Sequence, residues 1–289
     1  ANERLLEMAR ERGDSQPLRT LLEKKLERVE DRAERAALLR ELAELMEAKP
    51  GAEEGAISVL EELRTLVPSD QMALERLDAL LCQSGRMEEA AEILLRRIEL
   101  AGSELERAPM VMRLAQIQLE DLSDQKAGVA SLKQAAHLAP EDPRPLHRLR
   151  EVAESSQDDA LLAETLDALA GRSQDPEEES GLRRALGLLR WSVGQKEAAR
   201  KAFERLLTLD PDDGLAHRFM ARMLADEKDP AALVHLRWLL GHEDLLHPVD
   251  ALACMRAFIE IAEDASPTER IDVLKSILEL APGDESATQ

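Results

Sequence analysis

The stretch Ser180–Asp213, SGLRRALGLLRWSVGQKEAARKAFERLLTLDPDD, decides the fold that the sequence predicts. Apolar residues recur at three- and four-residue spacing in its two halves, which a turn glycine separates. Gly187 and Ala199 are small enough to let two helix backbones approach closely, and Phe203 would fill the space between them. Pro211 cannot continue a helix but suits the start of the next one. The stretch therefore predicts a helix–turn–helix hairpin.

The same landmarks recur along the chain. In residues 37–70, for example, Ala56, Leu60 and Pro68 repeat the order of small, apolar and proline positions. The sequence resembles the tetratricopeptide repeat family, whose repeat is a helical hairpin of about 34 residues. The resemblance implies an all-α fold, a right-handed α-solenoid (superhelix) of about eight hairpins. We expect one repeat domain over residues 1–289, with units at approximately 3–36, 37–70, 71–104, 109–142, 143–176, 180–213, 214–247 and 251–284.

Some units depart from the pattern. Residues 143–176 and 214–247 match it weakly, so these units would mark a bend or a partner surface. A four-residue insertion precedes the unit at 109–142. We interpret the acidic run 175–179 as a connector, because clustered like charges do not favour a buried face. Residues 266–269, Ser-Pro-Thr-Glu, predict a capping box at the start of a helix.

The composition is strongly acidic, with 38 Lys and Arg, 59 Asp and Glu and a formal net charge of −21. Such a charge argues against binding to nucleic acid or to anionic membrane surfaces, because phosphates need clustered cations. No run approaches the roughly 18 apolar residues that span a membrane, so we expect no membrane insertion. The two cysteines imply no disulfide framework, which favours a reducing compartment, and we expect a cytoplasmic protein. The chain starts with Ala, so an upstream targeting signal could be missing.

The Ala-, Leu- and Arg-rich usage suggests a GC-rich bacterial genome. No pattern of catalytic residues stands out from this composition. We find no Gly-rich phosphate loop, no His-Glu-x-x-His motif and no Cys-x-x-Cys motif. His242 and His247 flank Glu243 and Asp244, but a spacing of five does not place both imidazoles on one helical face. We therefore predict no metal site, no cofactor and no enzymatic activity within these residues.

The resemblance implies that the first helix of each hairpin lines the concave surface of the superhelix. An acidic chain would thus place arginines in the middle of its groove, with one tryptophan near the end of a first helix. Arginine suits carboxylates because its planar guanidinium can donate two parallel hydrogen bonds. We predict a groove that binds an acidic, partly apolar peptide or helix through Arg113, Arg144, His147, Arg148, Arg184, Trp191, Arg218 and Arg222. The alternative is that these arginines pair with Glu on adjacent repeats, or only keep the groove hydrated.

These observations favour a non-catalytic scaffold for protein–protein interactions. The alternative is a regulatory or sensor repeat region of a larger multidomain enzyme or assembly. Chaperone-binding members of the family hold a terminal carboxylate with Lys and Asn. The sequence argues against that mode here, because Asn2 is the only asparagine. The last predicted helix is apolar on more than one face, with Ile271, Leu274 and Leu280 among its residues. Self-association through this C-terminal helix, or a partner that covers it, is a third possibility.

Overall fold

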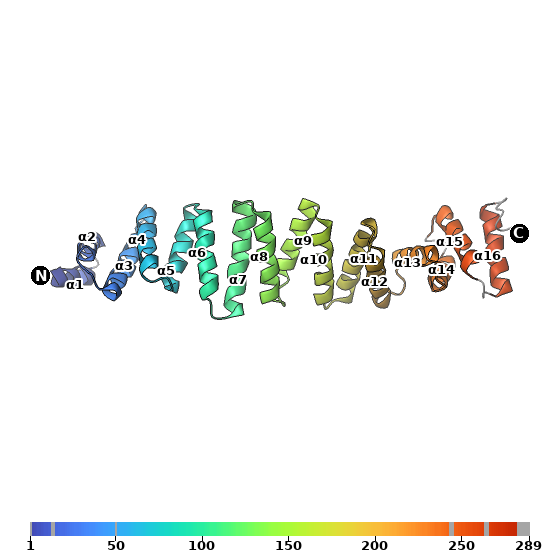
Figure 1. Cartoon of the computed structure of the whole chain (residues 1–289), viewed down its shortest axis with the longest axis horizontal. Coiled ribbons are helices and arrows are strands. Elements are labelled where there is room, and N and C mark those ends of the chain that lie inside the picture. The colour runs from blue at the N-terminus through green and yellow to red at the C-terminus, as the bar shows by residue number, and fades with distance from the viewer. Residues whose placement is uncertain (1, 13–14, 50, 243–245, 263–265, 282–289) are drawn as a thin grey trace. The chain divides into compact units, whose positions relative to one another are not determined.

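The computed structural model describes residues 2–12, 15–49, 51–242, 246–262 and 266–281. Within these ranges the chain forms sixteen α-helices and one short π-helix, and none of these residues lies in a β-strand. Successive helices are joined by short connections (Figure 1). The prediction of an all-α helical-repeat fold is confirmed. The chain divides into two compact units, residues 1–145 and 146–289, so a single right-handed array stays a prediction.

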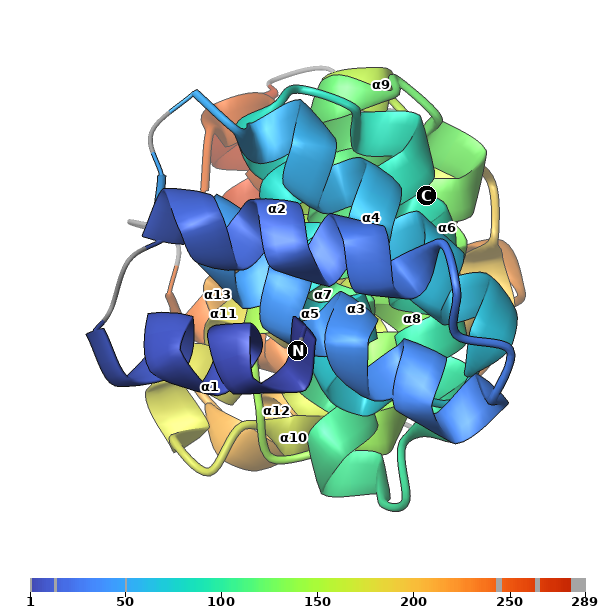
Figure 2. The same cartoon turned by 90° about the vertical axis from the view of Figure 1, so that its left-hand side faces the viewer.

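Unit 1 is built from consecutive helical hairpins. Figure 2 looks onto the first of them, in which α1 and α2 lie side by side. The helices of this unit are α1 (Asn2–Arg12), α2 (Ser15–Leu26), α3 (Arg32–Glu47), α4 (Glu53–Leu66), α5 (Gln71–Gln83), α6 (Met87–Leu100), α7 (Glu104–Gln116) with the π-helix η1 (Ile117–Asp121), and α8 (Gln125–Leu138).

Unit 2 continues the same alternation of first and second helices. Its helices are α9 (Arg144–Ser156, whose first residues fall in unit 1), α10 (Asp159–Arg172), α11 (Pro176–Ser192), α12 (Lys196–Leu209), α13 (Gly214–Asp226), α14 (Ala232–Gly241), α15 (Pro248–Ile261) and α16 (Pro267–Leu280). The end of the last predicted unit, residues 282–284, lies outside the described residues.

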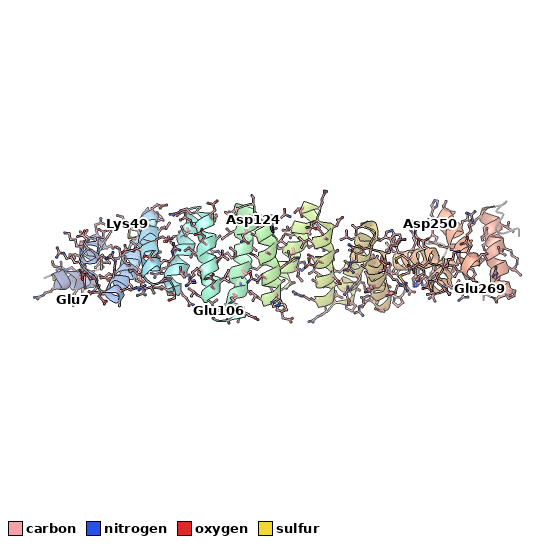
Figure 3. All side chains as sticks on the ribbon, viewed as in Figure 1. Glu7, Lys49, Glu106, Asp124, Asp250 and Glu269 are labelled. Atoms are coloured by element: carbon pink, nitrogen blue, oxygen red, sulfur yellow. The ribbon has the colours of Figure 1, made fainter. Side chains whose placement is uncertain are left out.

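Short polar side chains start many of these helices by accepting a hydrogen bond from a free backbone N–H of the first turn. Ser266 accepts from the N–H of Glu269 at 3.2 Å, as the predicted capping box requires of its serine. Charged side chains cover the outer surfaces of the helices, and Figure 3 labels one cap, Asp124 at the start of α8. Aspartates that cap in the same way are Asp31, Asp70, Asp124, Asp158 and Asp213.

The hairpin α11/α12 has the core that its sequence predicts. Ala199 and Phe203 are fully buried. A Cβ atom on Gly187 would lie 2.5 Å from Cε1 of Phe203, so only glycine lets the phenyl ring pack against α11. Gly194 in the connecting turn has a φ of +78°, which L-residues with side chains rarely adopt. Local sequence therefore determines the close approach of these two helices.

Several expected unit boundaries fall inside helices. Helix α3 begins at Arg32, because Asp31 caps it, so the expected boundary between residues 36 and 37 lies inside a helix. The inserted residues 105–108 form the first turns of α7, which begins at Glu104 and continues through Pro109. The insertion therefore lengthens a helix instead of adding a loop.

The acidic run 175–179 is not a connector. Asp175 caps α11, and the glutamates that follow form its first turn, where carboxylates complement the helix dipole. Glu179 is buried and accepts from Nε and Nη2 of Arg205, both at 2.9 Å. The last carboxylate of an acidic run can thus enter a packed region when it has its own donors.

Candidate functional site

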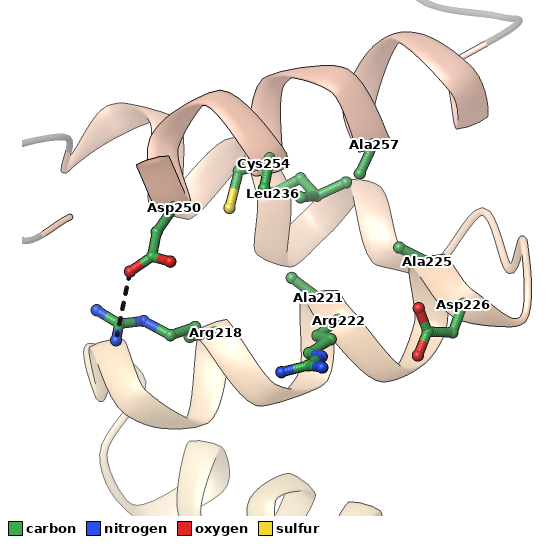
Figure 4. A pocket seen from close by; sticks show the side chains of 10 residues that line it. Arg218, Ala221, Arg222, Ala225, Asp226, Leu236, Asp250, Cys254 and Ala257 are labelled. Carbon is green, nitrogen blue, oxygen red and sulfur yellow. Dashed lines mark ion pairs between the residues drawn. The ribbon is translucent and has the colours of Figure 1, made fainter. Parts of the chain in front are cut away.

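Two adjoining cavities lie along α13, in unit 2, on the side that faces α15. One has a volume of about 320 Å³ and the other about 580 Å³. Arg218, Arg222 and Asp250 line both of them, so the cavities meet at these side chains. Figure 4 shows the smaller cavity between α13 and α15. We call the two cavities together the α13/α15 cleft.

Small side chains make room for the smaller cavity. Ala221 and Ala225 are four residues apart on α13, and Ala253 and Ala257 are four residues apart on α15. This spacing places each pair on one face of its helix, and all four alanines line the cavity. Leu236 of α14, which is almost fully buried, contributes the apolar floor. Sequence reasoning missed this site, although alanines at four-residue spacing on two successive first helices are visible in the sequence.

Charged groups stand on both walls of the cleft. Nη1 of Arg218 on α13 is 4.0 Å from Oδ2 of Asp250 on α15, and both side chains are about half exposed, at 49% and 50%. Arg222 also comes from α13 and is exposed. Asp226 lies at the far end of the smaller cavity and is 3.9 Å from Nζ of Lys196 on α12.

Arg222 has an aromatic neighbour. Its guanidinium lies 5.5 Å from the ring centre of Trp191, at the end of α11, within the range of a cation–π contact. Trp191 in turn packs edge-to-face on Phe219 of α13, with ring centres 5.3 Å apart. Among the described residues, no carboxylate lies within ion-pair distance of Arg222. The structure thus brings together three residues that the sequence predicted for one groove, Trp191, Arg218 and Arg222.

Cys254 also lines the smaller cavity. Burial and the nearby carboxylate of Asp250 raise the pKa of its thiol above the ordinary value. The thiol therefore stays protonated at neutral pH, which is the unreactive form. Among the residues that the structure describes, no three His, Cys, Asp or Glu side chains gather in a way that could hold a metal ion.

Other predicted groove residues are engaged by carboxylates. In unit 1, Nη1 of Arg113 is 3.2 Å from Oδ2 of Asp78, which is completely buried and also binds Arg97. Arg144 donates to both oxygens of Asp142 and holds the pKa of that carboxyl below its usual value. Arg113 thus pairs with an Asp of the preceding hairpin, whereas the partner of Arg144 is an Asp only two residues away in the sequence.

The predicted residues of α9 and α11 are placed differently from those of α13. Nε of Arg184 donates at 2.7 Å to Asp213, the buried residue that caps α13, so this arginine helps to position the cleft wall. Arg148 donates to Glu151 one turn further along α9, and His147 is exposed on the same helix. A role of these side chains in binding stays a prediction.

A regular signal could have revealed the pairing. Several arginines bind a carboxylate about one repeat away along the chain, because equivalent positions on successive hairpins lie side by side. Arg184 and Asp213 are 29 residues apart, and Arg237 and Glu269 are 32 apart. The same relation holds for Arg10 with Glu41, Arg40 with Asp70 and Arg76 with Glu44. Opposite charges at this separation are therefore candidates for ion pairs between successive hairpins.

A histidine pair lies behind the cleft in the hairpin α13/α14. Nε2 of the buried His217 is 2.9 Å from the carbonyl oxygen of Pro211, and a carbonyl only accepts, so this nitrogen carries a proton. In neutral His217, Nδ1 therefore accepts from Nδ1–H of His235, 3.0 Å away. Burial, and then the charge of His217, lower the pKa of His235 to about 4. His235 is therefore neutral at neutral pH, and its hydrogen bond joins it to the buried His217.

His242 and His247, which were considered for a metal site, lie at the ends of two different helices, α14 and α15. His242 stacks on Trp238, with ring centres 4.1 Å apart, and its Nδ1 lies 2.8 Å from the carbonyl oxygen of the same residue. His247 caps α15. Glu243 and Asp244 lie outside the described residues.

No described helix combines the length and the apolar character that crossing a membrane requires.

Comparison with known proteins gives a family for part of the chain. Residues 180–223 match the tetratricopeptide repeat family. No curated protein matches the chain significantly.

Solved structures with a similar fold include the C-terminal part of a TPR repeat-containing protein from Cytophaga hutchinsonii, at 13% identity and a TM-score of 0.36 over 88% of this chain and 98% of that one. They also include YrrB, a TPR protein with an unusual peptide-binding site, at 14% identity and a TM-score of 0.38 over 63% of this chain and 90% of that one.

A third similar structure is that of Naa15/Naa10 bound to HypK, at 15% identity and a TM-score of 0.46 over 99% of this chain and 43% of that one. These identities and TM-scores describe a likeness only. The family match is confined to residues 180–223, and the described helices continue as hairpins on both sides of it.

Proposed function

We propose that this protein is a non-catalytic interaction scaffold that binds an acidic, partly apolar polypeptide segment in the α13/α15 cleft. The observation that carries the proposal is Arg222, an exposed guanidinium on the cleft wall that contacts an aromatic ring and no carboxylate of the described residues. The chain has 59 acidic against 38 basic residues, and most arginines on first helices are already paired. An arginine beside Trp191 with no carboxylate is therefore available to a partner.

The cleft offers both kinds of contact that such a segment needs. A carboxylate of the partner can accept two parallel hydrogen bonds from the guanidinium of Arg222. An apolar side chain next to it can enter the alanine-lined cavity above Leu236, where burial contributes roughly 25 cal/mol per Å² of apolar surface. The walls are helices packed in a repeat array, so little ordering of the protein opposes binding.

The experiment compares two charge reversals on the same background. A random peptide library is selected on the wild type, on Arg222→Glu and on Lys201→Glu, which reverses an exposed cation of α12 outside the cleft. We expect peptides with Asp or Glu next to an apolar residue to be enriched on the wild type and on Lys201→Glu, and lost on Arg222→Glu. Their affinity should fall as salt rises, because the exposed charges are screened.

Arg184 is a poor target for this test. Its reversal would place a second negative charge beside Asp213 and disturb the start of α13, so lost binding would not report on contact with a partner. Enrichment of peptides without acidic residues, or equal enrichment on Arg222→Glu, would contradict the proposal. A cytoplasmic location in a bacterium, and service as the regulatory region of a larger enzyme, stay predictions from the sequence.

A second candidate function, self-association, has one specific observation in its favour. Ile271 and Leu280 on α16 are 50% and 47% exposed, although both are large apolar side chains. A second copy that covers this face would give a mass that rises with protein concentration in light scattering. The change Ile271→Asp would then reduce that rise, and a concentration-independent mass would remove the candidate.

A further inference from the structure

We propose that the Arg218–Asp250 ion pair is a gate inside the α13/α15 cleft. Asp250 holds the guanidinium of Arg218 in the free protein, and an acidic side chain of the bound segment takes its place. The inference rests on the proposed function and adds the step by which the cleft opens. It makes Asp250 an internal competitor that sets how strongly acidic partners bind.

The position of the pair is the first argument. Arg218 and Asp250 line both cavities, so their contact lies where the two spaces meet. Figure 4 shows the ion pair reaching from α13 to α15. The smaller cavity extends from it toward Ala257, and the larger cavity is lined by Leu215 and Leu246. Separation of the pair would join the two spaces into one cleft along α13.

The weakness of the pair is the second argument. Its atoms are 4.0 Å apart and both side chains are half exposed, and such pairs contribute little to stability because water screens them. Arg184 is different, since its partner Asp213 is nearly fully buried and caps α13. A carboxylate from outside can therefore replace Asp250 at little cost, whereas it cannot replace Asp213 without disturbing a helix.

The role of Asp250 in its own helix is the third argument. Helix α15 begins at Pro248, and its cap is His247, whose ring nitrogen accepts from the N–H of Val249. Asp250 lies in the first turn, where its charge favours the helix dipole whether or not it binds Arg218. The side chain can turn away from Arg218 without loss of a cap, which is what a reversible gate requires.

The experiment measures the affinity of the wild type and of Asp250→Asn for an acidic peptide selected on the wild type. The control peptide has Gln in place of its acidic residues. We expect Asp250→Asn to bind the acidic peptide about two- to five-fold more tightly, the range that an exposed ion pair allows. The Gln peptide should not gain. Asp272→Asn, which removes an exposed charge from α16, controls for the change in net charge.

Two further measurements separate a gate from a general charge effect. In an Arg218→Gln background the change Asp250→Asn should add nothing, because the competing contact is already absent. In a Cys82→Ser background, alkylation of Cys254 reports the opening of the cleft. Arg218→Gln breaks the ion pair and also removes a charge that lowers the pKa of the thiol, so faster alkylation in this variant would come from opening of the cleft and not from the charge. Bound acidic peptide should slow the alkylation.

The possible failures are distinguishable. If no acidic peptide is selected, or if selected peptides bind Arg222→Glu as well as the wild type, the proposed function is wrong. If the peptide binds through Arg222, but Asp250→Asn binds it as strongly as the wild type or more weakly, the proposed function is kept and the gate is wrong. Thermal melts of each variant, followed by circular dichroism, show that a change in binding does not come from unfolding.

Discussion

The successive hairpins α11/α12 and α13/α14 of unit 2 follow the same plan but obey it to different degrees. In the first, Gly194 takes the left-handed backbone conformation of the turn, with a φ of +78°. In the second, Lys228 adopts that conformation with a φ of +57°, although a side chain makes it unfavourable. The match to the family ends at residue 223, within α13. The second hairpin is therefore the one that leaves the repeat pattern.

The cores of these hairpins also differ, and again the first follows the repeat pattern more closely than the second. The first is closed by Phe203, which packs against Gly187 of the facing helix. The second contains the hydrogen-bonded pair His217 and His235, with Trp238 stacked on His217. The second hairpin also supplies a wall and the floor of the α13/α15 cleft. The regular hairpin α11/α12 therefore has a closed apolar core, whereas the irregular hairpin α13/α14 lines the candidate site.

The largest effect should come from the core of the regular hairpin. Phe203→Ala removes a fully buried ring and leaves a space that Gly187 cannot fill. We expect the free energy of unfolding of unit 2 to fall by about 3–5 kcal/mol. Both tryptophans belong to this unit, so denaturant unfolding followed by their fluorescence measures it. Phe219→Ala, a half-buried ring stacked on Phe203, is the control and should cost less.

An intermediate effect should come from the histidine pair of the irregular hairpin. The pKa of His235 is lowered from an ordinary value near 6.5 to about 4, so between these pH values the unfolded chain binds a proton that the folded chain does not. Stability of unit 2 should therefore fall as the pH drops from 6.5 toward 4. The group should contribute no pH dependence above that window.

The size of this loss is on the order of 1–2 kcal/mol, because His235 is only partly buried and water reduces the full effect of the shift. Denaturant unfolding at a series of pH values measures it. In His235→Gln this part of the pH dependence should disappear. A slope that is the same in His235→Gln and in the wild type would show that the histidine pair does not titrate in this way.

The smallest effect should come from the two turns. Lys228→Gly relieves a left-handed backbone conformation, and we expect the free energy of unfolding to rise by about 1 kcal/mol. Gly194→Ala imposes the same strain on the regular hairpin and should lower it by about 1 kcal/mol. Thermal melts of the two variants should therefore shift in opposite directions. A shift of the same sign in both would break the comparison between the turns.

Much of the fold could be predicted from the sequence, because its signals are local. Apolar spacing, turn glycines and the small residue opposite Phe203 act over a few positions, and they predicted the hairpins of residues 37–70 and 180–213. One kind of error came from residues whose effect depends on a partner. This holds for Glu179, which enters a packed region because Arg205 reaches it from the next helix. The early start of α3 is a different error, because its cap, Asp31, is a local signal that the repeat length overrode.

The sequence by itself determined that this chain is a series of helical hairpins, and it named Trp191, Arg218 and Arg222 as residues of interest. Only the tertiary structure decided which of the predicted groove arginines hold a carboxylate, such as Arg113 and Arg184, and that Arg222 has none within ion-pair distance among the described residues. The reason is physical: helix formation depends on neighbours within a turn or two along the chain. The state of a charge depends on the groups that packing brings beside it, about one repeat away.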